Sequence, residues 1–507
     1  MVVRNERPRR TIAVSLALSA VILLVAAAVI ASSAQLAPEQ AKPQFKTSFI
    51  PVPDSPSSAV YDSFNGYVYV SYGNGSAGGV SVANGTTNLA NITLDSGPGP
   101  ILYDPSNHYI YAAGVNSHYA AIINGTEIIG KVFATSPSSF VYDPANGLVY
   151  MASQTSGPQI EIINGTSQIG YVNAGQPSSN MVYDSYNGYV YVTNSESNTT
   201  SVISGTGLRS NVATGPGPSA LVFDSSNGLI YIADEGYGFG HEVSVINGTR
   251  NVATINVRAS PSSLLYDPVN GYVYVSNNGG TTISVIDRTT NIANVSIGFR
   301  PFSGLHEPST GFVYMPDQDG YDVSVINGTR VVADIATGPR PSDALYNPSN
   351  NYVYVSNSGF VGVCFGGCPF QPSDVVSIIK GSAVIENVTV GEGPGPLLYD
   401  PGHDSVYVLV PNGMYVITSP NATSTTTLSS LSGSVTITMI TTPTTTSTTT
   451  SASITVTTTS TSSLQTNTDV GTSWTLGIVL SILVILSASV VLAAALLLWR
   501  RGQVQTK

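Results

Sequence analysis

The sequence predicts an all-β fold in which one unit is repeated around a ring. The phrase "PSSNMVYDSYNGYVYVTN" at 177–194 returns in recognisable form about every 40 residues. Each copy contains runs of Tyr, Val and Ile separated by Asn-Gly, which is typical of short strands joined by tight turns. A period near 40 residues with this strand-type composition indicates a β-propeller. We therefore expect one large propeller rather than several domains.

The copies can be aligned on one aromatic position of their first strand. Nine such copies imply about nine four-stranded blades, although four to eight blades are usual. A ring of eight blades with one repeat outside it is the alternative. The seventh copy has His306 at the aligned position where the other eight copies have Tyr or Phe, and we interpret this as a packing substitution. The aligned positions are Tyr61, Tyr103, Tyr142, Tyr183, Phe223, Tyr266, His306, Tyr346 and Tyr399.

The repeat at 261–298 shows the expected order of strands within a blade. Its first strand starts at Pro261, because proline cannot donate a hydrogen bond within a sheet and therefore suits a strand entrance. The second strand, 272–275, carries large residues on both faces, so we expect neighbouring blades to cover both. Asn270 and Gly271 are expected to take the positive φ angles of a tight hairpin.

The last repeat lacks a fourth strand, and the start of the chain supplies a spare one. The segment "FKTSFIPV" at 45–52 precedes the first repeat and has strand-type composition. Pairing it with the last repeat would close the ring and remove two exposed sheet edges. The propeller is therefore predicted over 45–418.

Both ends of the chain carry segments that do not belong to the ring. Residues 1–34 combine four arginines, an apolar run and small residues, which indicates a signal peptide or an uncleaved signal-anchor. In the segment 419–470, 33 of 52 residues are Thr or Ser. Such a composition cannot build a core, so we expect a disordered stalk that carries O-linked sugars.

The segment 475–499 is predicted to be a transmembrane helix. It is apolar or small throughout, and Trp474 and Trp499 stand at its borders. A helix of this length spans about 36 Å, enough for a hydrocarbon core of about 30 Å. Arg500 and Arg501 then mark residues 500–507 as a cytoplasmic tail. We expect a single-pass membrane protein whose propeller and stalk are extracellular.

The charge of the chain excludes nucleic-acid binding. Its net charge is −11, only 9% of its residues are charged, and seven of its 18 Lys and Arg residues lie in the terminal tails. A surface with so little positive charge cannot track a phosphate backbone.

The repeat resembles that of the YVTN-family β-propellers, which occur in surface-layer-like cell-surface proteins of archaea. The signature tetrapeptide stands at 191–194, and "YVSN" variants begin at Tyr274 and Tyr354. The resemblance covers roughly 45–419 and implies a cell-surface propeller, although the family also includes a few lyase-like relatives. Where the family has an Asp-Thr-rich turn between third and fourth strands, this chain repeatedly has Asn-Gly-Thr.

The chain contains eleven Asn-x-Ser/Thr sequons, and five share the turn between third and fourth strands. Asn-Gly suits such a turn whatever follows it, but a turn alone does not require the Thr that follows in all five. Together with export, this favours N-glycosylation. The sequons lie at Asn74, Asn84, Asn91, Asn124, Asn164, Asn198, Asn247, Asn294, Asn327, Asn387 and Asn421, and the shared turn holds Asn84, Asn124, Asn164, Asn247 and Asn327.

Hairpin topology places the turns after first and third strands on one rim of the ring. The loops after second and fourth strands then lie on the opposite rim, where the loops after second strands differ in length and composition between copies. Variable loops on a repeated scaffold are where recognition is expected.

Three weaker candidates lie in or beside these loops. Cys364 and Cys368 are the only cysteines and predict a disulfide, because a metal site would need two further ligands and their loop has no His. Three neighbouring carboxylates could ligate Ca²⁺, but their spacing is incomplete and favours solvated acids. Two arginines before prolines of successive repeats could hold an anion, although separate solvated side chains are the commoner outcome. The acids are Asp317, Asp319 and Asp322, and the arginines are Arg300 and Arg340.

Catalysis is the minority interpretation. The five histidines fall in different repeats, of which His118 and His241 lie in loops of the expected recognition rim, and no catalytic or cofactor-binding motif occurs. We assign no catalytic residue and no cofactor. The sequence favours a membrane-anchored, glycosylated surface propeller for structure, adhesion or interaction with surface proteins or glycans. The alternative is an extracytoplasmic lyase-like enzyme or small-ligand binder that uses the central channel.

Overall fold

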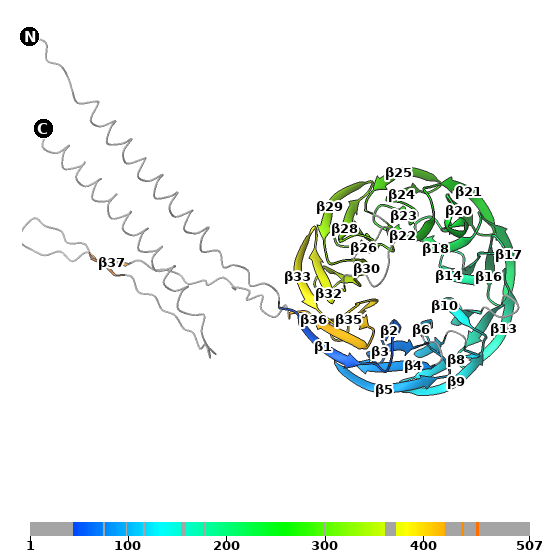
Figure 1. Cartoon of the computed structure of the whole chain (residues 1–507), viewed down its shortest axis with the longest axis horizontal. Helices are drawn as coiled ribbons and strands as arrows, with labels where there is room; N and C mark the ends of the chain where they lie inside the picture. Colours follow the sequence, from blue (N-terminus) through cyan, green and yellow to red (C-terminus); the bar gives the residue numbers. More distant parts are fainter. Residues whose placement is uncertain are drawn as a thin grey trace, which may run out of the picture. The chain divides into compact units, whose positions relative to one another are not determined.

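The ring of the protein consists of nine four-stranded antiparallel sheets arranged as blades around one axis (Figure 1). The computed structural model describes residues 44–74, 77–97, 99–114, 117–153, 159–175, 178–298, 300–359, 372–420, 438–440 and 453–455. Nine blades confirm the count of sequence repeats, and the alternative of eight blades with one repeat outside the ring is wrong.

The first three blades follow one another along the chain. Blade 1 contains β2 (Pro56–Asp62), β3 (Tyr67–Gly73), β4 (Gly78–Asn84) and β5 (Thr87–Leu94). Blade 2 contains β6 (Ile101–Asp104), β7 (Tyr109–Ala113), β8 (Tyr119–Asn124) and β9 (Glu127–Phe133). Blade 3 contains β10 (Pro137–Asp143), β11 (Leu148–Ser153), β12 (Gln159–Asn164) and β13 (Ser167–Asn173).

The middle three blades repeat this order. Blade 4 contains β14 (Ser178–Asp184), β15 (Tyr189–Asn194), β16 (Thr199–Ser204) and β17 (Gly207–Ala213). Blade 5 contains β18 (Pro218–Asp224), β19 (Leu229–Asp234), the short 3₁₀ helix η1 (Gly236–Gly238), β20 (Glu242–Asn247) and β21 (Arg250–Asn256). Blade 6 contains β22 (Pro261–Asp267), β23 (Tyr272–Asn277), β24 (Thr282–Asp287) and β25 (Thr290–Ser296).

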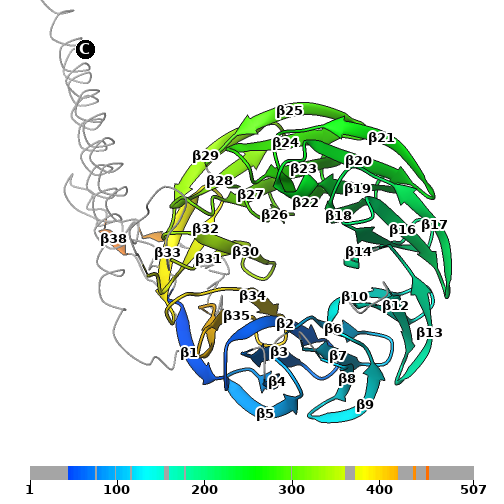
Figure 2. The same cartoon turned by 45° about the vertical axis from the view of Figure 1, so that its right-hand side comes forward.

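The last three blades complete the ring. Blade 7 contains β26 (Leu305–Glu307), β27 (Phe312–Pro316), β28 (Asp322–Asn327) and β29 (Arg330–Ala336). Blade 8 contains β30 (Pro341–Asn347), β31 (Tyr352–Asn357), β32 (Val375–Lys380) and β33 (Ala383–Thr389). Blade 9 contains β34 (Leu397–Asp400), β35 (Ser405–Val410), β36 (Gly413–Thr418) and, from the start of the chain, β1 (Lys46–Pro51). Figure 2 shows the fourth strands, such as β5, β9 and β25, at the outside of the ring and the first strands nearest the axis.

The start of the chain closes the ring as the sequence predicts. Strand β1 pairs antiparallel with β36 from Lys46 opposite Thr418 to Pro51 opposite Gly413. The last blade therefore gains its missing fourth strand, and two unpaired edges disappear. Proline also begins β2, β10, β18, β22 and β30, as expected from its missing donor.

The hydrophobic core is divided into nine clusters, and each cluster joins two neighbouring blades. In the cluster between blades 5 and 6, for example, Tyr231 and Val243 pack with Val273 and Val275. The second strands are covered on both faces, since Val273, Tyr274 and Val275 are all 0% exposed. One fully buried second-strand tyrosine belongs to each blade: Tyr69, Tyr111, Tyr150, Tyr191, Tyr231, Tyr274, Tyr314, Tyr354 and Tyr407.

Most of these tyrosines donate a hydrogen bond across the blade boundary. The hydroxyl of Tyr274 in blade 6 donates to the carbonyl of Gly328 in blade 7 at 3.0 Å, and Asn270 donates to the same hydroxyl at 3.1 Å. The acceptor glycine lies in the two-residue turn between third and fourth strands. We call this hydrogen bond the blade clamp, and it recurs from Tyr111 to Gly165, Tyr150 to Gly205, Tyr191 to Gly248, Tyr314 to Gly381 and Tyr407 to Gly85.

The turn between first and second strands differs from the expected one. In blade 6 it has four residues, closed by a hydrogen bond from the Gly271 amide to the Asp267 carbonyl at 2.9 Å. Only Gly271 takes a positive φ (+76°), so the expectation of positive φ at Asn270 is wrong. The side chain of Asn270 instead accepts a hydrogen bond from the Tyr272 amide at 2.8 Å. This contact and the bond to Tyr274 explain the recurrence of Asn.

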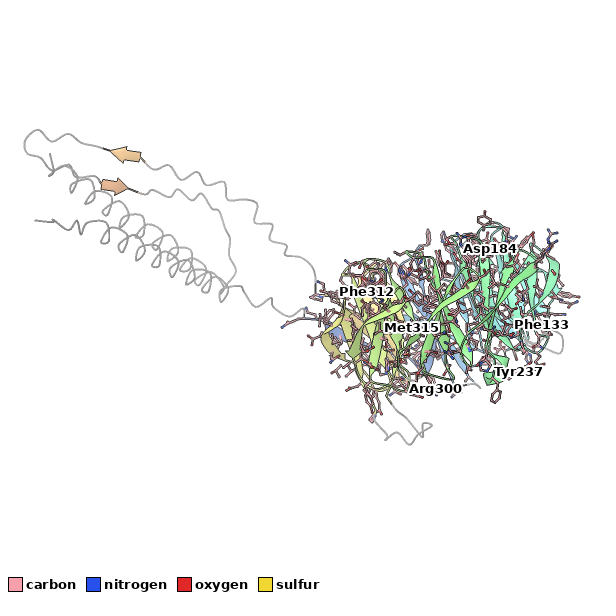
Figure 3. All side chains as sticks on the ribbon, turned by 90° about the horizontal axis from the view of Figure 1, so that it is seen from above. Phe133, Asp184, Tyr237, Arg300, Phe312 and Met315 are labelled. Carbon is pink, nitrogen blue, oxygen red and sulfur yellow. The ribbon has the colours of Figure 1, made fainter. Side chains whose placement is uncertain are left out.

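The turns after first strands and the turns after third strands lie on the same rim of the ring, as the sequence predicts. We call this the turn rim, and we call the opposite rim the loop rim. Figure 3 shows Asp184 and Phe312 on the turn rim and Tyr237 and Arg300 on the loop rim.

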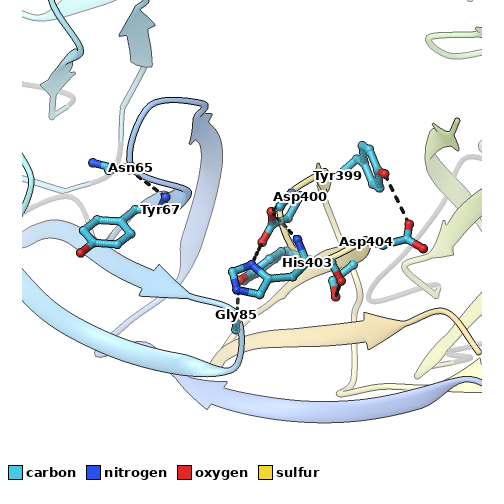
Figure 4. A network of polar contacts seen from close by, with 10 residues as sticks. Asn65, Tyr67, Gly85, Tyr399, Asp400, His403 and Asp404 are labelled. Carbon is cyan, nitrogen blue, oxygen red and sulfur yellow. Dashed lines mark hydrogen bonds and ion pairs between the residues drawn. The ribbon is translucent and has the colours of Figure 1, made fainter. Parts of the chain in front are cut away.

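At the closure, the clamp joins residues that are 322 positions apart. Tyr407 of blade 9 donates to the carbonyl of Gly85 in blade 1 at 2.5 Å. Beside it, Nδ1 of His403 lies 2.9 Å from a carboxylate oxygen of the buried Asp400 (Figure 4). His403 occupies the place of Asn270 in blade 6, so the closure keeps the packing of an ordinary blade boundary.

Outside the ring, the structure describes two short strands, β37 (Thr438–Ile440) and β38 (Ser453–Thr455), which pair with each other. The other residues of the predicted stalk from 421 onward, the signal segment at 1–34, the span at 475–499 and the tail at 500–507 lie outside the described residues. Among the residues that are described, no helix has the length and apolar character needed to cross a membrane.

We predict that removing the clamp at the closure destabilises the ring. Tyr407→Phe leaves the carbonyl of Gly85 without its donor, which costs about 1–2 kcal/mol of unfolding free energy. Tyr231→Phe is the matched control, because the Tyr231 hydroxyl makes no blade clamp and Arg288 stands at the glycine position of blade 6. Denaturant unfolding of the full-length protein measures both, and equal losses would contradict a role for the clamp.

Candidate functional site

The loop rim is built from two kinds of loop. The number of residues between second and third strands varies, from two at 411–412 in blade 9 to seventeen at 358–374 in blade 8, of which 360–371 lie outside the described residues. The connecting loops lead from the fourth strand of one blade to the first strand of the next.

Backbone hydrogen bonds join the two kinds of loop at several blade boundaries. The amide of Arg300 donates to Gly280 of blade 6 at 3.1 Å, and the carbonyl of Arg300 accepts from Gln318 of blade 7 at 3.3 Å. Arg340 repeats both contacts one blade later, with Gly320 and Ser358 at 3.0 Å each. The varied loops therefore rest on a regular backbone frame.

These contacts hold the connecting loops in an uncommon backbone conformation. The residue before the proline has φ of +54° at both Arg300 and Arg340, and Ser136 and Ser260 take the same region. Non-glycine residues rarely adopt positive φ, and such conformations persist only where the surroundings enforce them. The arginine backbones are thus fixed by the frame.

The anion site at Arg300 and Arg340 stays a prediction, and the structure describes the contacts of Arg300. Nε of Arg300 donates to the Asn278 side chain at 2.9 Å, and one terminal nitrogen lies 3.6 Å from a carboxylate oxygen of Asp319. Arg300 is therefore balanced by an acid of the neighbouring blade. Arg340 lies at the next blade boundary.

Beneath the loops lies a layer of buried polar side chains that sequence reasoning missed. Each is the last residue of a second strand or its immediate neighbour, and all are 0% exposed. We call them lock residues, because they join the end of the second strand to the third strand and to the connecting loop. They are Asn194, Asp234, Asn277, Asp317 and Asn357.

The asparagine locks donate to a serine of the third strand. Nδ2 of Asn277 lies 3.0 Å from the Ser284 hydroxyl, and Nδ2 of Asn357 lies 3.0 Å from the Ser377 hydroxyl. The connecting loop packs directly onto the lock: a Cβ atom on Gly338 would lie 2.8 Å from the Cβ of Asn357. The final Asn of each "YVTN" or "YVSN" phrase was the available signal for this layer.

Aspartate replaces asparagine as the lock in blades 5 and 7. The Ser244 hydroxyl donates to Asp234 at 2.7 Å, and the Gly215 amide donates to that hydroxyl at 3.1 Å. Burial, opposed by these hydrogen bonds, raises the pKa of Asp234 to about 7. In blade 7 the Gly298 amide donates to Asp317 at 3.1 Å. Burial, and then the neighbouring Asp322, raise the pKa of Asp317 to about 8.

The three acids considered as calcium ligands are divided between different partners. Asp317 is buried beside Asp322, whereas Asp319 faces Arg300. Among the described residues, no group of three His, Cys, Asp or Glu side chains is arranged to hold a metal ion. Cys364 and Cys368 lie outside the described residues, so their disulfide stays a prediction.

The loop of blade 5 presents two aromatic side chains to solvent. Tyr237 is 64% exposed and Phe239 is 84% exposed. Tyr237 has a φ of +56° within η1, and its hydroxyl donates to the Ser195 carbonyl of blade 4 at 3.1 Å. The loop is thus held against its neighbour while Phe239 projects from it. His241 follows in the same loop and is exposed, as is His118 in blade 2.

The sequon asparagines lie on the surface. Of the ten that are described, nine are exposed and Asn84 is half-buried, whereas Asn421 is outside the described residues. The five shared turns lie on the turn rim, and their glycines take φ of +56° to +60°. Asn91 and Asn294 differ, because their side-chain oxygens accept hydrogen bonds from Ser81 and Ser284 of the adjacent strand at 2.5 and 2.8 Å.

The histidine at an anchor position does pack within the ring. His306 is 8% exposed in its side chain, and its Nε2 lies 3.0 Å from the buried carboxylate of Asp267 in the neighbouring blade. It takes the place from which Tyr103, for example, reaches Ser63 of the preceding blade.

Comparisons with known proteins concern the fold alone. No family model and no curated protein matches the chain. Similar solved structures include the C-terminal WD40 domain of Sif2, with a TM-score of 0.49, 10% identity, and coverage of 74% of this chain and 98% of that one. The dihydro-heme d1 dehydrogenase NirN has a TM-score of 0.45, 16% identity and coverages of 61% and 70%. A streptogramin B lyase has a TM-score of 0.38, 13% identity and coverages of 56% and 93%.

We predict that the contact between connecting loop and lock tolerates no added methyl group. Gly338→Ala places a Cβ against the buried Asn357 side chain and costs about 1–3 kcal/mol through overpacking. Gly280→Ala is the matched control on the same rim, because its Cβ would meet no atom within 4 Å. Thermal unfolding of the full-length variants distinguishes them, and a neutral Gly338→Ala would contradict the tight packing.

Proposed function

We propose that this protein is a membrane-anchored, glycosylated, extracellular propeller of the YVTN type. A β-propeller of this kind suits protein–protein interaction or ligand binding, because it holds loops of independent length on a rigid ring. Its role is non-catalytic: it contributes to cell-surface structure, adhesion or interaction through its loop rim. Its partners are other surface proteins or glycans.

The observation that carries this proposal is where the ring begins and where it ends, at Phe45 and Ser419. The Ser419 hydroxyl accepts a hydrogen bond from Asn350 of the turn rim at 2.8 Å. At the other end, the Phe45 ring packs edge-on against Tyr354, with centroids 6.2 Å apart. Both connections to the rest of the chain therefore start on the turn rim. A tether that begins there leaves from the side opposite to the loops.

The two rims also differ in what they present. The turn rim carries the five Asn-Gly-Thr turns, so sugars attached there would cover the side that holds the tether. The loop rim carries none of these five turns, and it presents Tyr237, Phe239 and loops of several lengths, with the sequons Asn74 and Asn198 in two of its other loops. This division supports the loop rim as the contacting surface.

Replacing the exposed aromatic residues of the loop rim tests the proposal. We predict that Tyr237→Ala combined with Phe239→Ala weakens cell-to-cell or layer association at least tenfold, because exposed aromatic side chains dominate such contacts. Tyr186→Ala is the control, since Tyr186 is 77% exposed but lies in a turn of the turn rim. Association of cells that display each full-length variant is the measurement. Equal association of all variants, or a larger loss for Tyr186→Ala, would overturn the assignment of the loop rim.

Sugar occupancy provides a second prediction. We expect the exposed turn sequons at Asn124, Asn164, Asn247 and Asn327 to be more fully modified than Asn91 and Asn294. The side chains of the latter two are held by Ser81 and Ser284, so an approaching enzyme must first break those hydrogen bonds. Mass spectrometry of peptides from the exported protein gives the occupancy of each site. Full occupancy at Asn91 and Asn294 with empty turns would contradict the expectation.

A further inference from the structure

The lock of blade 5 holds a carboxyl group where other blades hold an amide. Asp234 is 0% exposed, as are Asn194, Asn277 and Asn357 at the same position. One of its oxygens accepts from Ser244, and the other has no hydrogen-bond partner among the described residues. An ionised carboxylate in this position would be buried with half of its hydrogen-bonding capacity unused, which is costly.

Among the described residues, no Lys, Arg or His side chain forms an ion pair with Asp234. From the third strand, Glu242 faces it and adds a negative charge, and Ser244 is neutral. From the connecting loop, the Gly215 backbone approaches it: a Cβ there would lie 2.7 Å from the Asp234 side chain. The loop that follows Asp234 contains Glu235, and His241 at its far end is exposed. Protonation of Asp234 removes the charge that these neighbours leave uncompensated.

We propose that Asp234 is a proton-dependent lock, which holds the loop rim of blade 5 closed in acidic surroundings and releases it as the pH rises through neutrality. When protonated, Asp234 matches the neutral amide of the asparagine locks, and the chain from Asp234 through Ser244 to Gly215 stays intact. When it loses the proton, the buried charge is relieved only if the connecting loop at 213–217 or the loop at 235–241 moves and admits water. The second of these loops carries Tyr237 and Phe239, so the contacting surface itself becomes less ordered.

The direction of the pH dependence follows from the raised pKa. Between the ordinary pKa of an Asp in an unfolded chain, about 4, and the folded value of about 7, the folded protein holds a proton that the unfolded chain does not. The stabilising effect of this proton is complete below about pH 4 and is lost as the pH rises to about 7. Asp317 has the same position in blade 7, but its titration is coupled to that of Asp322, so Asp234 is the cleaner position for a test.

The test compares Asp234→Asn with the unmodified full-length protein across pH 4 to 9. We expect the ratio of the folding equilibrium constants, unmodified over variant, to fall about tenfold per pH unit from about pH 4 to 7 and then to level off. Amide exchange at 213–217 and 235–241 should accelerate above pH 7 in the unmodified protein, relative to unfolded peptides, but not in Asp234→Asn. Asp374→Asn, at an exposed acid of another loop, should leave the ratio flat.

A second variant, which places the carboxyl group in another blade, distinguishes an effect of the lock from a general loss of stability. Asn277→Asp puts a carboxyl group into the lock of blade 6 beside Ser284 and should create a new pH dependence of the same sign, with faster exchange at 278–281. A ratio for Asp234→Asn that does not change with pH would overturn the proposal. The proposal would also be overturned if about 1 mM Ca²⁺ restored the folding stability of the unmodified protein at pH 8, because a cation rather than a proton would then occupy the site.

Discussion

The hydrogen bond from a buried second-strand tyrosine to a turn glycine of the next blade is the contact on which the ring depends. Apolar packing alone would let neighbouring blades slide, whereas a hydroxyl enclosed in that packing must find its acceptor at one place. The acceptor carbonyl is presented by a two-residue turn whose glycine has positive φ, which holds the carbonyl toward the neighbouring blade. Tyr274 and Gly328 show the arrangement in the interior of the chain, and Tyr407 and Gly85 show it where the ends meet. The same contact thus sets blade spacing and seals the ring.

Because the blade clamp reaches the turn rim and not the loop rim, the two rims differ in how far their sequences can vary. On the turn rim, the glycine between Asn and Thr accepts the clamp in four of the five shared turns, so these sequons are built around a residue that the fold requires. The loop rim has no clamp, and its order comes instead from backbone bonds between loops and from the lock residues below them. A loop can therefore lengthen from 278–281 in blade 6 to 358–374 in blade 8 while Asn277 and Asn357 keep equivalent contacts. Variation is possible there because the layer that supports it stays constant.

Most of the fold could be predicted from the sequence because its determinants are local and repeated. Each determinant lies within a short window of sequence: the strand-type runs, the prolines at strand starts and the spare strand at 45–52. Nine copies of the repeat reinforce the first two and reveal the period. The one local error concerned Asn270, whose side chain rather than its backbone conformation explains its recurrence. The lock residues were not predicted from the sequence, because Asn at the end of a strand is typical of a turn and its serine partner lies on another strand. The pairing of Arg300 with Asp319 crosses a blade boundary, which no periodicity reveals.

Several repeated positions in blades 5 to 7 carry a different residue from the other blades. His306 stands at a tyrosine position and faces Asp267, and Glu307 stands at an aspartate position and accepts a hydrogen bond from Thr310. Arg288 replaces the turn glycine of blade 6, and the clamp from Tyr231 is missing there. Asp234 has no such partner, so of these replacements it is the one whose neutrality must come from a proton. A ring of nine similar interfaces can carry such exceptions, because each interface is stabilised by its own core cluster and the remaining clamps keep the blades in place.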